Sequence, residues 1–553
     1  MDKLRPATYE EFCKTFASNT PENFNFAFDV LDKMADENPD GLAMIHIEDD
    51  FKRVDYTFGY FRDESTKLAN ALLEKGIKKG DRVMLILYRR VEFWVSMLAL
   101  HKIGALPIPS PSLLTTHDIE MRVPYANVRC MIVEDSIKER VDAARAKTPS
   151  IKLHVQVGGE VTEGWEDYRA LVDSGSKEMT KTADSPGGDD PFLIFFSSGT
   201  TGLPKMVMHD YTYAHSHYKT GAYWHDLEPG DIHLTLSDTG WGKCAWGKFY
   251  GQWMAEAVIV VWDFRGRFEP SNLLNVMAEH KISTFCAPPT VYRFMIREDI
   301  EKWDLSALRH CTTAGELLND SVFHTWKEKT GIDIYEGYGQ TETTLQVATF
   351  SNMEAKPGSI GKPVPGWDIV LLDMEGKEVP TGEEGEICVR LVNDSGNNGV
   401  EGLFCEYFEE PAKTADVKVD GYYHTGDKAW ADEDGYLWFM GRVDDLLKSS
   451  GYRIGPFEVE SALISHDAVV EAAVTGVPDA VRGQAVKATI VLAPDFTESD
   501  ELTKELQNHV KKVTAPYKYP RIIEYVQELP KTISGKIKRA EIRKADEEKY
   551  KLD

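Results

Sequence analysis

The sequence predicts an α/β protein with a large N-terminal domain of stacked α/β sheets, a small β-subdomain within it, and a small α+β C-terminal domain. Three observations support this. Strand and helix patterns alternate to about residue 310, short β-rich runs with glycine turns occupy 355–440, and residues 444–553 have their own succession of helices and strands. We therefore expect one domain over residues 1–443 and a second over 444–553.

The early chain carries the alternation. Residues 42–46 and 53–57 are expected to form a hairpin, 60–75 a helix, 82–88 an apolar strand and 92–102 a second helix. Such alternation predicts parallel sheets whose faces are covered by helices.

The segments after about residue 355 differ from the early chain in their glycine turns and in their charge. The runs 368–373, 385–390 and 435–440 predict the strands of the β-subdomain. In the C-terminal domain we expect helices at 456–466, 499–513 and 538–550, and strands at 469–477, 487–492 and 521–529. Acidic and basic residues are almost equal in number there, whereas the preceding domain is strongly acidic. A polyanionic ligand is therefore expected to dock on the C-terminal domain.

The charge and composition of the chain exclude some classes of binding partner. The 553 residues carry a formal net charge of −27, which argues against nucleic acid or an anionic membrane as partner. No apolar stretch approaches the length of a membrane span, and the N-terminus resembles neither a secretory signal nor a mitochondrial transit peptide. Seven scattered cysteines without a CxxC pair indicate free thiols in a reducing cytoplasm and argue against a metal site.

A loop rich in hydroxyls and glycines follows the apolar run 191–196. It reads SSGTTGLPK, from Ser197 to Lys205, and it is not a Walker A motif because no GK pair is followed by Ser or Thr. Backbone N–H groups, hydroxyls and the lysine suit a phosphate, while a plain surface turn is the alternative. The residues concerned are Ser197, Ser198, Gly199, Thr200, Thr201, Gly202 and Lys205.

Four further segments complete a pattern. They are YGQTE at 338–342, YHTGD at 423–427, GRVDD at 441–445 leading into KSSGYR at 448–453, and PKTISGK at 530–536. In this order and spacing they resemble the adenylate-forming superfamily of acyl-CoA synthetases, peptide-synthetase adenylation domains and luciferases, over about residues 25–545. The stretches 237–241, 449–456 and 514–520 are most similar to medium-chain acyl-CoA synthetases.

The resemblance implies a two-step reaction. A carboxylate attacks the α-phosphate of ATP to give an acyl-adenylate and pyrophosphate, and a thiol then takes the acyl group and releases AMP. ATP, Mg²⁺ and coenzyme A are the implied cofactors, and the loop from Ser197 to Lys205 would hold the β- and γ-phosphates.

By the same resemblance, Lys536, Glu342 and Thr341 are the catalytic candidates. Lys536 would reach the carboxylate and α-phosphate, Glu342 would hold Mg²⁺, and Thr341 would touch the α-phosphate or the acyl carboxylate. Asp427 and Arg442 would bind the ribose. The remaining residues expected around the nucleotide are Ala314, Gly315, Glu316, Glu336, Gly337, Tyr338, Gly339, Gln340 and Arg453.

The C-terminal domain would rotate between the two steps, which makes it mobile, with Asp444 as the hinge. The residues expected to contact CoA are Ser450, Gly451, Tyr452, Arg482, Lys511, Tyr517, Lys518 and Tyr519. Basic side chains suit the CoA phosphates, and tyrosine rings suit its adenine.

The acyl pocket is expected at Gly339 and Trp241. Acetate-specific relatives have a tryptophan where this chain has Gly339, so its absence predicts a medium-chain or branched acid. Lys243 and Lys248 either face solvent or mark an unusual acid. Two other functions stay open: transfer to a carrier-protein thiol, and a non-catalytic nucleotide or acyl sensor. The absence of a carrier domain disfavours the first, and the presence of Lys536 and Glu342 disfavours the second.

Overall fold

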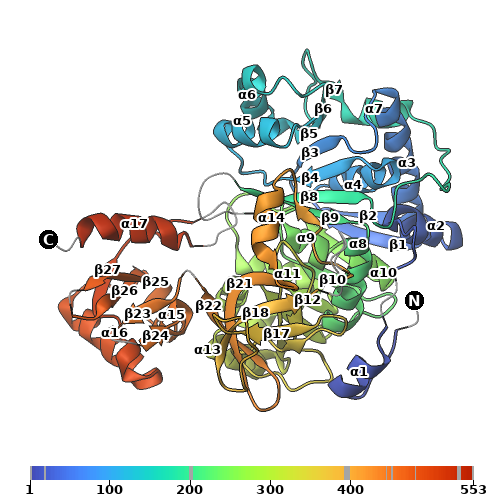
Figure 1. The fold of residues 1–553 in the computed structure, drawn as a ribbon. Helices are drawn as coiled ribbons and strands as arrows, with labels where there is room; N and C mark the ends of the chain where they lie inside the picture. The colour runs from blue at the N-terminus through green and yellow to red at the C-terminus, as the bar shows by residue number, and fades with distance from the viewer. Residues whose placement is uncertain are drawn as a thin grey trace.

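The computed structural model describes residues 3–17, 20–197, 204–391, 399–443, 445–449, 452–479, 481–531 and 537–550, except for the side chains of residues 453, 547 and 548. It confirms the mixed α/β class (Figure 1). The first layer is a parallel sheet in the order β4-β3-β5-β6-β7. Its strands are β3 (Arg82–Ile86), β4 (Leu106–Pro109), β5 (Cys130–Glu134), β6 (Leu153–Val157) and β7 (Glu166–Asp167).

A second sheet of nine strands follows the order β16-β15-β14-β13-β12-β10-β11-β1-β2. Its strands are β1 (Leu42–Ile47), β2 (Arg53–Thr57), β10 (Ile232–Thr235), β11 (Val258–Trp262), β12 (Thr284–Cys286), β13 (His310–Ala314), β14 (Ile334–Tyr338), β15 (Val347–Ala348) and β16 (Lys362–Pro363). The strands from β14 to β1 in this order pair in parallel, β15 pairs antiparallel with β14 and β16, and the β1–β2 pair is the expected antiparallel hairpin.

Helices cover these sheets, as the alternation predicts. They are α1 (Tyr9–Thr15), α2 (Lys33–Glu37), α3 (Phe58–Glu74), α4 (Val91–Ile103), α5 (Thr116–Tyr125), α6 (Lys138–Ala144), α7 (Tyr168–Ser174), α8 (Thr212–Tyr218), α9 (Gly242–Gly247), α10 (Tyr250–Met254), α11 (Pro270–Glu279), α12 (Pro289–Met295) and α13 (Asp320–Thr330). Helix α4 is apolar on almost every side because it lies between packed layers. Within the described residues, no helix is both long and apolar enough to cross a membrane.

The strands that flank the hydroxyl-rich loop depart from the parallel alternation expected there. Strands β8 (Pro191–Ser197) and β9 (Lys205–Asp210) pair antiparallel, with Ser197 opposite Lys205, and β19 (Glu406–Tyr407) pairs with β9. The connection between β8 and β9 is a hairpin, because it is too short for the crossover that a parallel pair requires. The two ends of the loop are thereby held side by side.

An antiparallel sheet forms the region from 369 to 442. It contains β17 (Ile369–Leu372), β18 (Glu384–Arg390), β20 (Lys418–Val419), β21 (Tyr422–Ala431) and β22 (Leu437–Arg442), with α14 (Pro411–Val417) beside it. Each of the three β-rich runs in the sequence overlaps a strand of this sheet. A bulge interrupts the pairing of β18 with β21 between Glu386 and Cys388.

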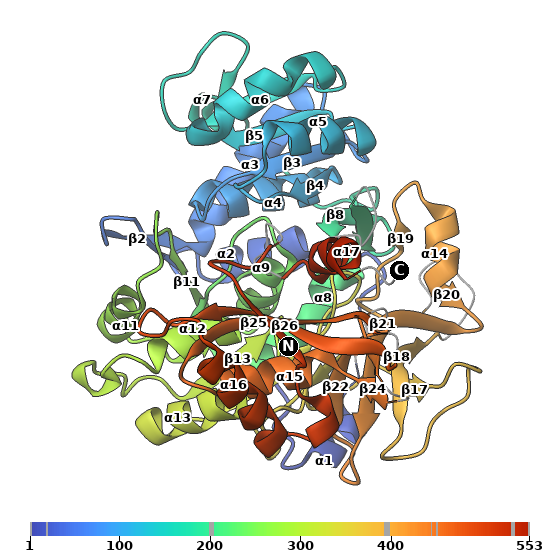
Figure 2. The same ribbon diagram turned by 90° about the vertical axis from the view of Figure 1, so that its left-hand side faces the viewer.

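The last unit has its own sheet (Figure 2). It also has its own apolar core. Its elements are β23 (Leu447–Ser449), β24 (Tyr452–Ile454), α15 (Pro456–Ile464), β25 (Val469–Asp479), β26 (Gly483–Leu492), α16 (Asp500–Val513), β27 (Ile522–Tyr525) and α17 (Arg539–Lys549). All six predicted elements are confirmed, but the short β23–β24 hairpin is missed because it has too few residues to show a period. The Nδ2 of Asn319 donates to the backbone oxygen of Ser461 at 2.9 Å and so joins this unit to the body.

Candidate active site

Asp427 is the centre of a buried hydrogen-bond network. Its Oδ2 accepts from the hydroxyl of Tyr338 and from Nε2 of Gln340, both at 2.6 Å. Burial first, and the Asp427 charge second, raise the pKa of Tyr338 well above its ordinary value, so its hydroxyl stays a donor. Arg442 lies across the β21–β22 ladder from Asp427, with Nη1 3.8 Å from Oδ1. The C-terminal end of β14 and the β21–β22 pair therefore meet at one carboxylate.

Tyr423 secures the amide of Gln340 in this network. Its hydroxyl donates to Oε1 of Gln340 at 2.7 Å, while Nε2 of Gln340 also donates to the backbone oxygen of Thr425 at 2.8 Å. With both ends of the amide engaged, the segment that follows β14 is fixed against β21. This segment carries Thr341 and Glu342.

A chain of three side chains links Glu342 to the hydroxyl-rich loop. The Nζ of Lys205 donates to the hydroxyl of Tyr407 at 3.1 Å, and that hydroxyl donates to Oε1 of Glu342 at 2.9 Å. Burial and the Glu342 charge raise the pKa of Tyr407, which keeps the hydroxyl protonated. Tyr407 belongs to no recognisable motif, because only the pairing of β19 with β9 brings it to Lys205.

His209 anchors the backbone beside Thr341. Its Nε2 lies 2.8 Å from the carbonyl oxygen of Thr341, which can only accept. Burial lowers the pKa of His209 to about 3, so the ring is neutral and its Nε2–H donates. The conformation of the Thr341 segment is thus set from β9, and sequence patterns did not reveal this residue either.

The segment expected to line the adenine ends β13. Gly315 has a φ of +99°, a conformation that favours glycine, and the Oε2 of Glu316 accepts from Oγ1 of Thr290 at 2.9 Å. The adenine wall expected from residues 336–338 stays a prediction, and the Glu336 side chain has other partners. Its carboxyl is buried and accepts from the backbone N–H groups of Leu318, at 3.1 Å, and Gly358, at 3.3 Å. The Glu336 carboxyl thereby links the loop that contains Leu318 to the loop that contains Gly358.

Burial also sets the protonation of Glu336. It raises the pKa of this carboxyl to about 8, against the smaller opposing effect of the two backbone donors. Glu336 is therefore largely protonated at neutral pH.

Trp246 fills the space beside Gly339. A Cβ built on Gly339 would lie 2.4 Å from Cη2 of Trp246 and 2.4 Å from the backbone oxygen of Thr344. The room expected from the missing tryptophan is therefore taken by an indole from α9. Trp241 is only partly buried and precedes this helix.

The two lysines near the expected pocket have different surroundings. The Nζ of Lys243 donates to the backbone oxygen of Ala314 at 2.9 Å. Lys248 is buried, donates to the backbone oxygen of Ser237 at 2.5 Å, and has its pKa lowered to about 8 by burial. Lys248 therefore does not face solvent, and Lys243 is tied to the end of β13.

Comparisons with known proteins identify the family of the chain. The family described as AMP-binding enzyme matches residues 31–393, and the AMP-binding enzyme C-terminal domain matches residues 458–536. The chain belongs to the AMP-binding enzyme family. It is 41% identical over 555 residues to acyl-coenzyme A synthetase ACSM3 of Homo sapiens, covering 98% of this chain and 92% of the relative. It is 42% identical over 532 residues to ACSM4 of Rattus norvegicus, covering 95% and 90%.

Solved structures of AMP-binding enzymes share the fold. The anthranilate CoA ligase AuaEII in complex with anthranoyl-AMP has a TM-score of 0.87 and 31% identity, covering 96% of this chain and 99% of that one. An acyl-CoA synthetase of Brucella canis has a TM-score of 0.74 and 31% identity, covering 98% and 99%. The two ACSM relatives are named as mitochondrial proteins, so the cytoplasmic location expected from composition remains a prediction.

In this AMP-binding enzyme, several residues expected to contact CoA lie together on the C-terminal unit. The rings of Tyr452 and Tyr517 stack with centroids 4.2 Å apart, and both are exposed. The Nζ of Lys511 lies 4.1 Å from the ring centroid of Tyr519. Lys518 is paired with Glu458, and Arg482 with Asp479 at 3.3 Å. Arg482 precedes Gly483, which pairs with Ser449 where β23 meets β26, and Ser449 pairs in turn with Tyr452 of β24.

Part of the expected site lies outside the described residues. These positions are Ser198, Gly199, Thr200, Thr201, Gly202, Asp444, Ser450, Gly451, Lys536 and the side chain of Arg453. Their roles stay predictions.

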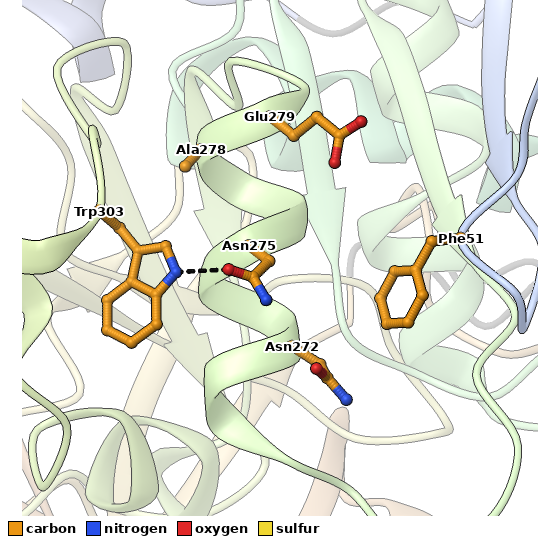
Figure 3. A pocket seen from close by; sticks show the side chains of 6 residues that line it. All are labelled: Phe51, Asn272, Asn275, Ala278, Glu279 and Trp303. Atoms are coloured by element: carbon orange, nitrogen blue, oxygen red, sulfur yellow. Dashed lines mark hydrogen bonds between the residues drawn. The ribbon is translucent and has the colours of Figure 1, made fainter.

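A surface cavity of about 390 Å³ lies on another part of the molecule (Figure 3). Asn272, Asn275 and Glu279 of α11 form its floor, with Phe51 on one side and Trp303 on the other. The Nε1 of Trp303 donates to Oδ1 of Asn275 at 2.6 Å. None of the motif residues lines this cavity, so it is not part of the candidate nucleotide site.

Proposed function

We propose that this chain is an ATP-dependent acid–thiol ligase that converts a medium-chain or branched carboxylic acid through an acyl-adenylate to an acyl-CoA, releasing AMP and pyrophosphate. The Lys205–Tyr407–Glu342 chain carries the proposal. It puts a cation from the phosphate-binding loop and a candidate metal carboxylate on either side of one hydroxyl. Asp427, the candidate ribose acceptor, is joined to the same segment through Gln340.

Glu342 is suited to Mg²⁺. Its carboxylate is mostly buried, and hard oxygen ligands are what this ion prefers, commonly one or two carboxylates together with substrate phosphates. Bound there, the ion would neutralise charge on the phosphates of ATP. Lys205 and the N–H groups of the loop would supply the remaining positive field, and Asp427 would orient the sugar.

The second half-reaction would use the exposed face formed by Tyr452 and Tyr517. The adenine of CoA could stack on the exposed face of this ring pair. Lys511 and Arg482 would supply positive charge for the CoA phosphates. Lys536 is expected to serve the first half-reaction. CoA is favoured over a carrier-protein thiol because these groups match its nucleotide end.

The identity of the carboxylic acid substrate is the most specific part of the proposal. Trp246 beside Gly339 would give the acyl pocket an aromatic wall. Its indole already occupies part of the space that a tryptophan at position 339 would fill. The relative that carries anthranoyl-AMP is named as an anthranilate ligase, so aromatic acids belong in any test.

A thioester screen tests the function. Purified protein, ATP, Mg²⁺ and CoA are incubated with straight acids of about two to twelve carbons and with branched and aromatic acids, and products are identified by mass spectrometry. We expect acyl-CoA and AMP to peak at a medium-length or branched acid. A peak at aromatic acids would overturn the substrate class, and AMP without acyl-CoA would overturn CoA as the acceptor. No product from any acid would overturn the ligase assignment.

A further inference from the structure

Three metal-ligating side chains meet on one face of the antiparallel sheet. Cys388 and His424 lie directly opposite each other in the β18–β21 pair, and Glu386 is two residues before Cys388 on β18. Residues i and i+2 of a strand share a face. One ligand atom from each of the three residues lies within 4.8 Å of the other two. Sequence spacing could not show this cluster, because His424 is 36 residues from Cys388.

The separations suit a tetrahedral ion. The Sγ of Cys388 lies 3.5 Å from Nδ1 of His424, and Oε2 of Glu386 lies 3.0 Å from the same nitrogen. Zinc bonds of roughly 2.0 to 2.3 Å place neighbouring ligand atoms about 3.3 to 3.6 Å apart. The sulfur–nitrogen separation already fits. The oxygen–nitrogen separation needs to open by a few tenths of an ångström.

Hydrogen bonding favours an ion over the side chains alone. Nδ1 of His424 faces both the carboxylate and the thiol, but one N–H can serve only one acceptor well. An ion would engage all three atoms together. Oε1 of Glu386 is held by the backbone N–H of Gly426 at 2.8 Å, which orients Oε2 toward His424 as an outer-shell bond should.

The ligand set and its exposure indicate the kind of ion. A thiolate and an imidazole select Zn²⁺ over the hard ions Mg²⁺ and Ca²⁺. Cys388 is buried, whereas about a quarter of each of the His424 and Glu386 side chains is exposed, so water can reach the fourth position.

We propose that Glu386, Cys388 and His424 bind one borderline-soft divalent cation, Zn²⁺ first, with water as the fourth ligand. The ion would hold β18 against β21 at the bulge from which Gly426 and Asp427 project. Its role is to position this bulge, since Glu386 accepts from the backbone N–H of Gly426, the residue before Asp427. The expectation of no metal site, drawn from cysteine spacing, would then be wrong.

Cobalt and zinc titrations test the site on the full-length protein after chelator treatment. We expect about one equivalent of Co²⁺ to give a thiolate-to-cobalt charge-transfer band that Zn²⁺ abolishes. Cys388→Ser should remove the band, and His424→Ala should weaken Zn²⁺ binding at least tenfold in a chelator competition. The matched control is Cys405→Ser, because Cys405 also lies beside a carboxylate, at 3.5 Å from Oδ2 of Asp210, and should keep the band.

Each result of these titrations either supports or overturns the proposed cation site. The absence of stoichiometric binding to the wild type, Co²⁺ binding without the thiolate band, or equal binding by Cys388→Ser would overturn the site. If Cys388→Ser does not fold, His424→Gln and the rise in Tm of the wild type with Zn²⁺ replace it. An unchanged Tm together with unchanged binding by His424→Gln would also overturn the proposal.

Discussion

At the scale of single residues, the site depends on side chains that stand between the recognisable motifs. Tyr407 lies between Lys205 and Glu342, and His209 holds the carbonyl of Thr341. Neither belongs to a motif, yet each fixes a residue that does. Glu336 shows the reverse, because it lies within a motif segment and its carboxyl serves two backbone N–H groups.

Replacing Tyr407 with Phe should slow adenylation. The ring stays packed against Phe404, whose centroid is 4.9 Å away, but the hydroxyl that joins Lys205 to Glu342 is lost. A hydrogen bond of about 0.5 to 1.5 kcal/mol corresponds to a roughly three- to tenfold loss of pyrophosphate release. We also expect a higher Mg²⁺ requirement. Tyr422→Phe is the control, since its hydroxyl contacts Arg390 instead, and an unchanged Mg²⁺ profile in Tyr407→Phe would contradict the role.

The stability of the fold should fall with pH through Glu336. Its pKa is about 8 in the folded protein and near 4.5 when unfolded, so the folded state binds more protons between these values. Stabilisation by the protonated carboxyl is therefore full below pH 4.5 and is lost as the pH rises toward 8, by up to about 1.4 kcal/mol per pH unit. Thermal unfolding of Glu336→Gln should lack this slope. Parallel pH profiles for the variant and the wild type would refute the shift.

At the scale of elements, short strands bring the loops together. The β8–β9 hairpin sets the ends of the hydroxyl-rich loop, β19 delivers Tyr407, and the β21–β22 ladder delivers Asp427. Helix α9 places Trp246 against the end of β14. The proposed acyl pocket would therefore be shaped by a helix–strand contact, with the identity of residue 339 as only one part of it.

Substitutions at the contact between Trp246 and Gly339 should change which carboxylic acid the enzyme prefers. Trp246→Phe should move the preferred acid toward longer chains, because a smaller ring leaves room beside Gly339. Because acetate-specific relatives have a tryptophan at this position, the resemblance predicts that Gly339→Trp favours acetate. The structure instead predicts loss of activity with every acid, since even a Cβ there would lie 2.4 Å from the Thr344 backbone oxygen. Competition assays with mixed acids measure both, and acetate activity in Gly339→Trp would show that the contact relaxes.

At the scale of the whole molecule, we propose that the reaction is divided between two units. The network around Asp427 lies in the body, whereas the exposed tyrosine pair lies on the C-terminal unit. We expect this unit to rotate between the half-reactions, presenting Lys536 in one and the tyrosine face in the other.

Lys536→Ala should therefore abolish formation of the adenylate but largely spare acyl-CoA formation from supplied acyl-adenylate. Separate assays of pyrophosphate release and of thioester formation measure the two steps. Tyr452→Ala should show the opposite pattern and serves as the matched comparison. Equal loss of both steps in Lys536→Ala would contradict the division of labour.

The sequence by itself determined the α/β class and the helices and strands predicted near the two ends of the chain, and it predicted the segments of a nucleotide site. This was possible because apolar periodicity and glycine- or hydroxyl-rich loops are local properties of the chain. Tertiary structure alone decided the antiparallel pairing around the loop, the partners of Glu336, and the place of Trp246 beside Gly339. It also decided the meeting of Glu386, Cys388 and His424. These contacts join residues that are distant along the chain or set by a bulge, and they exist only once strands have paired in register and helices have packed on them.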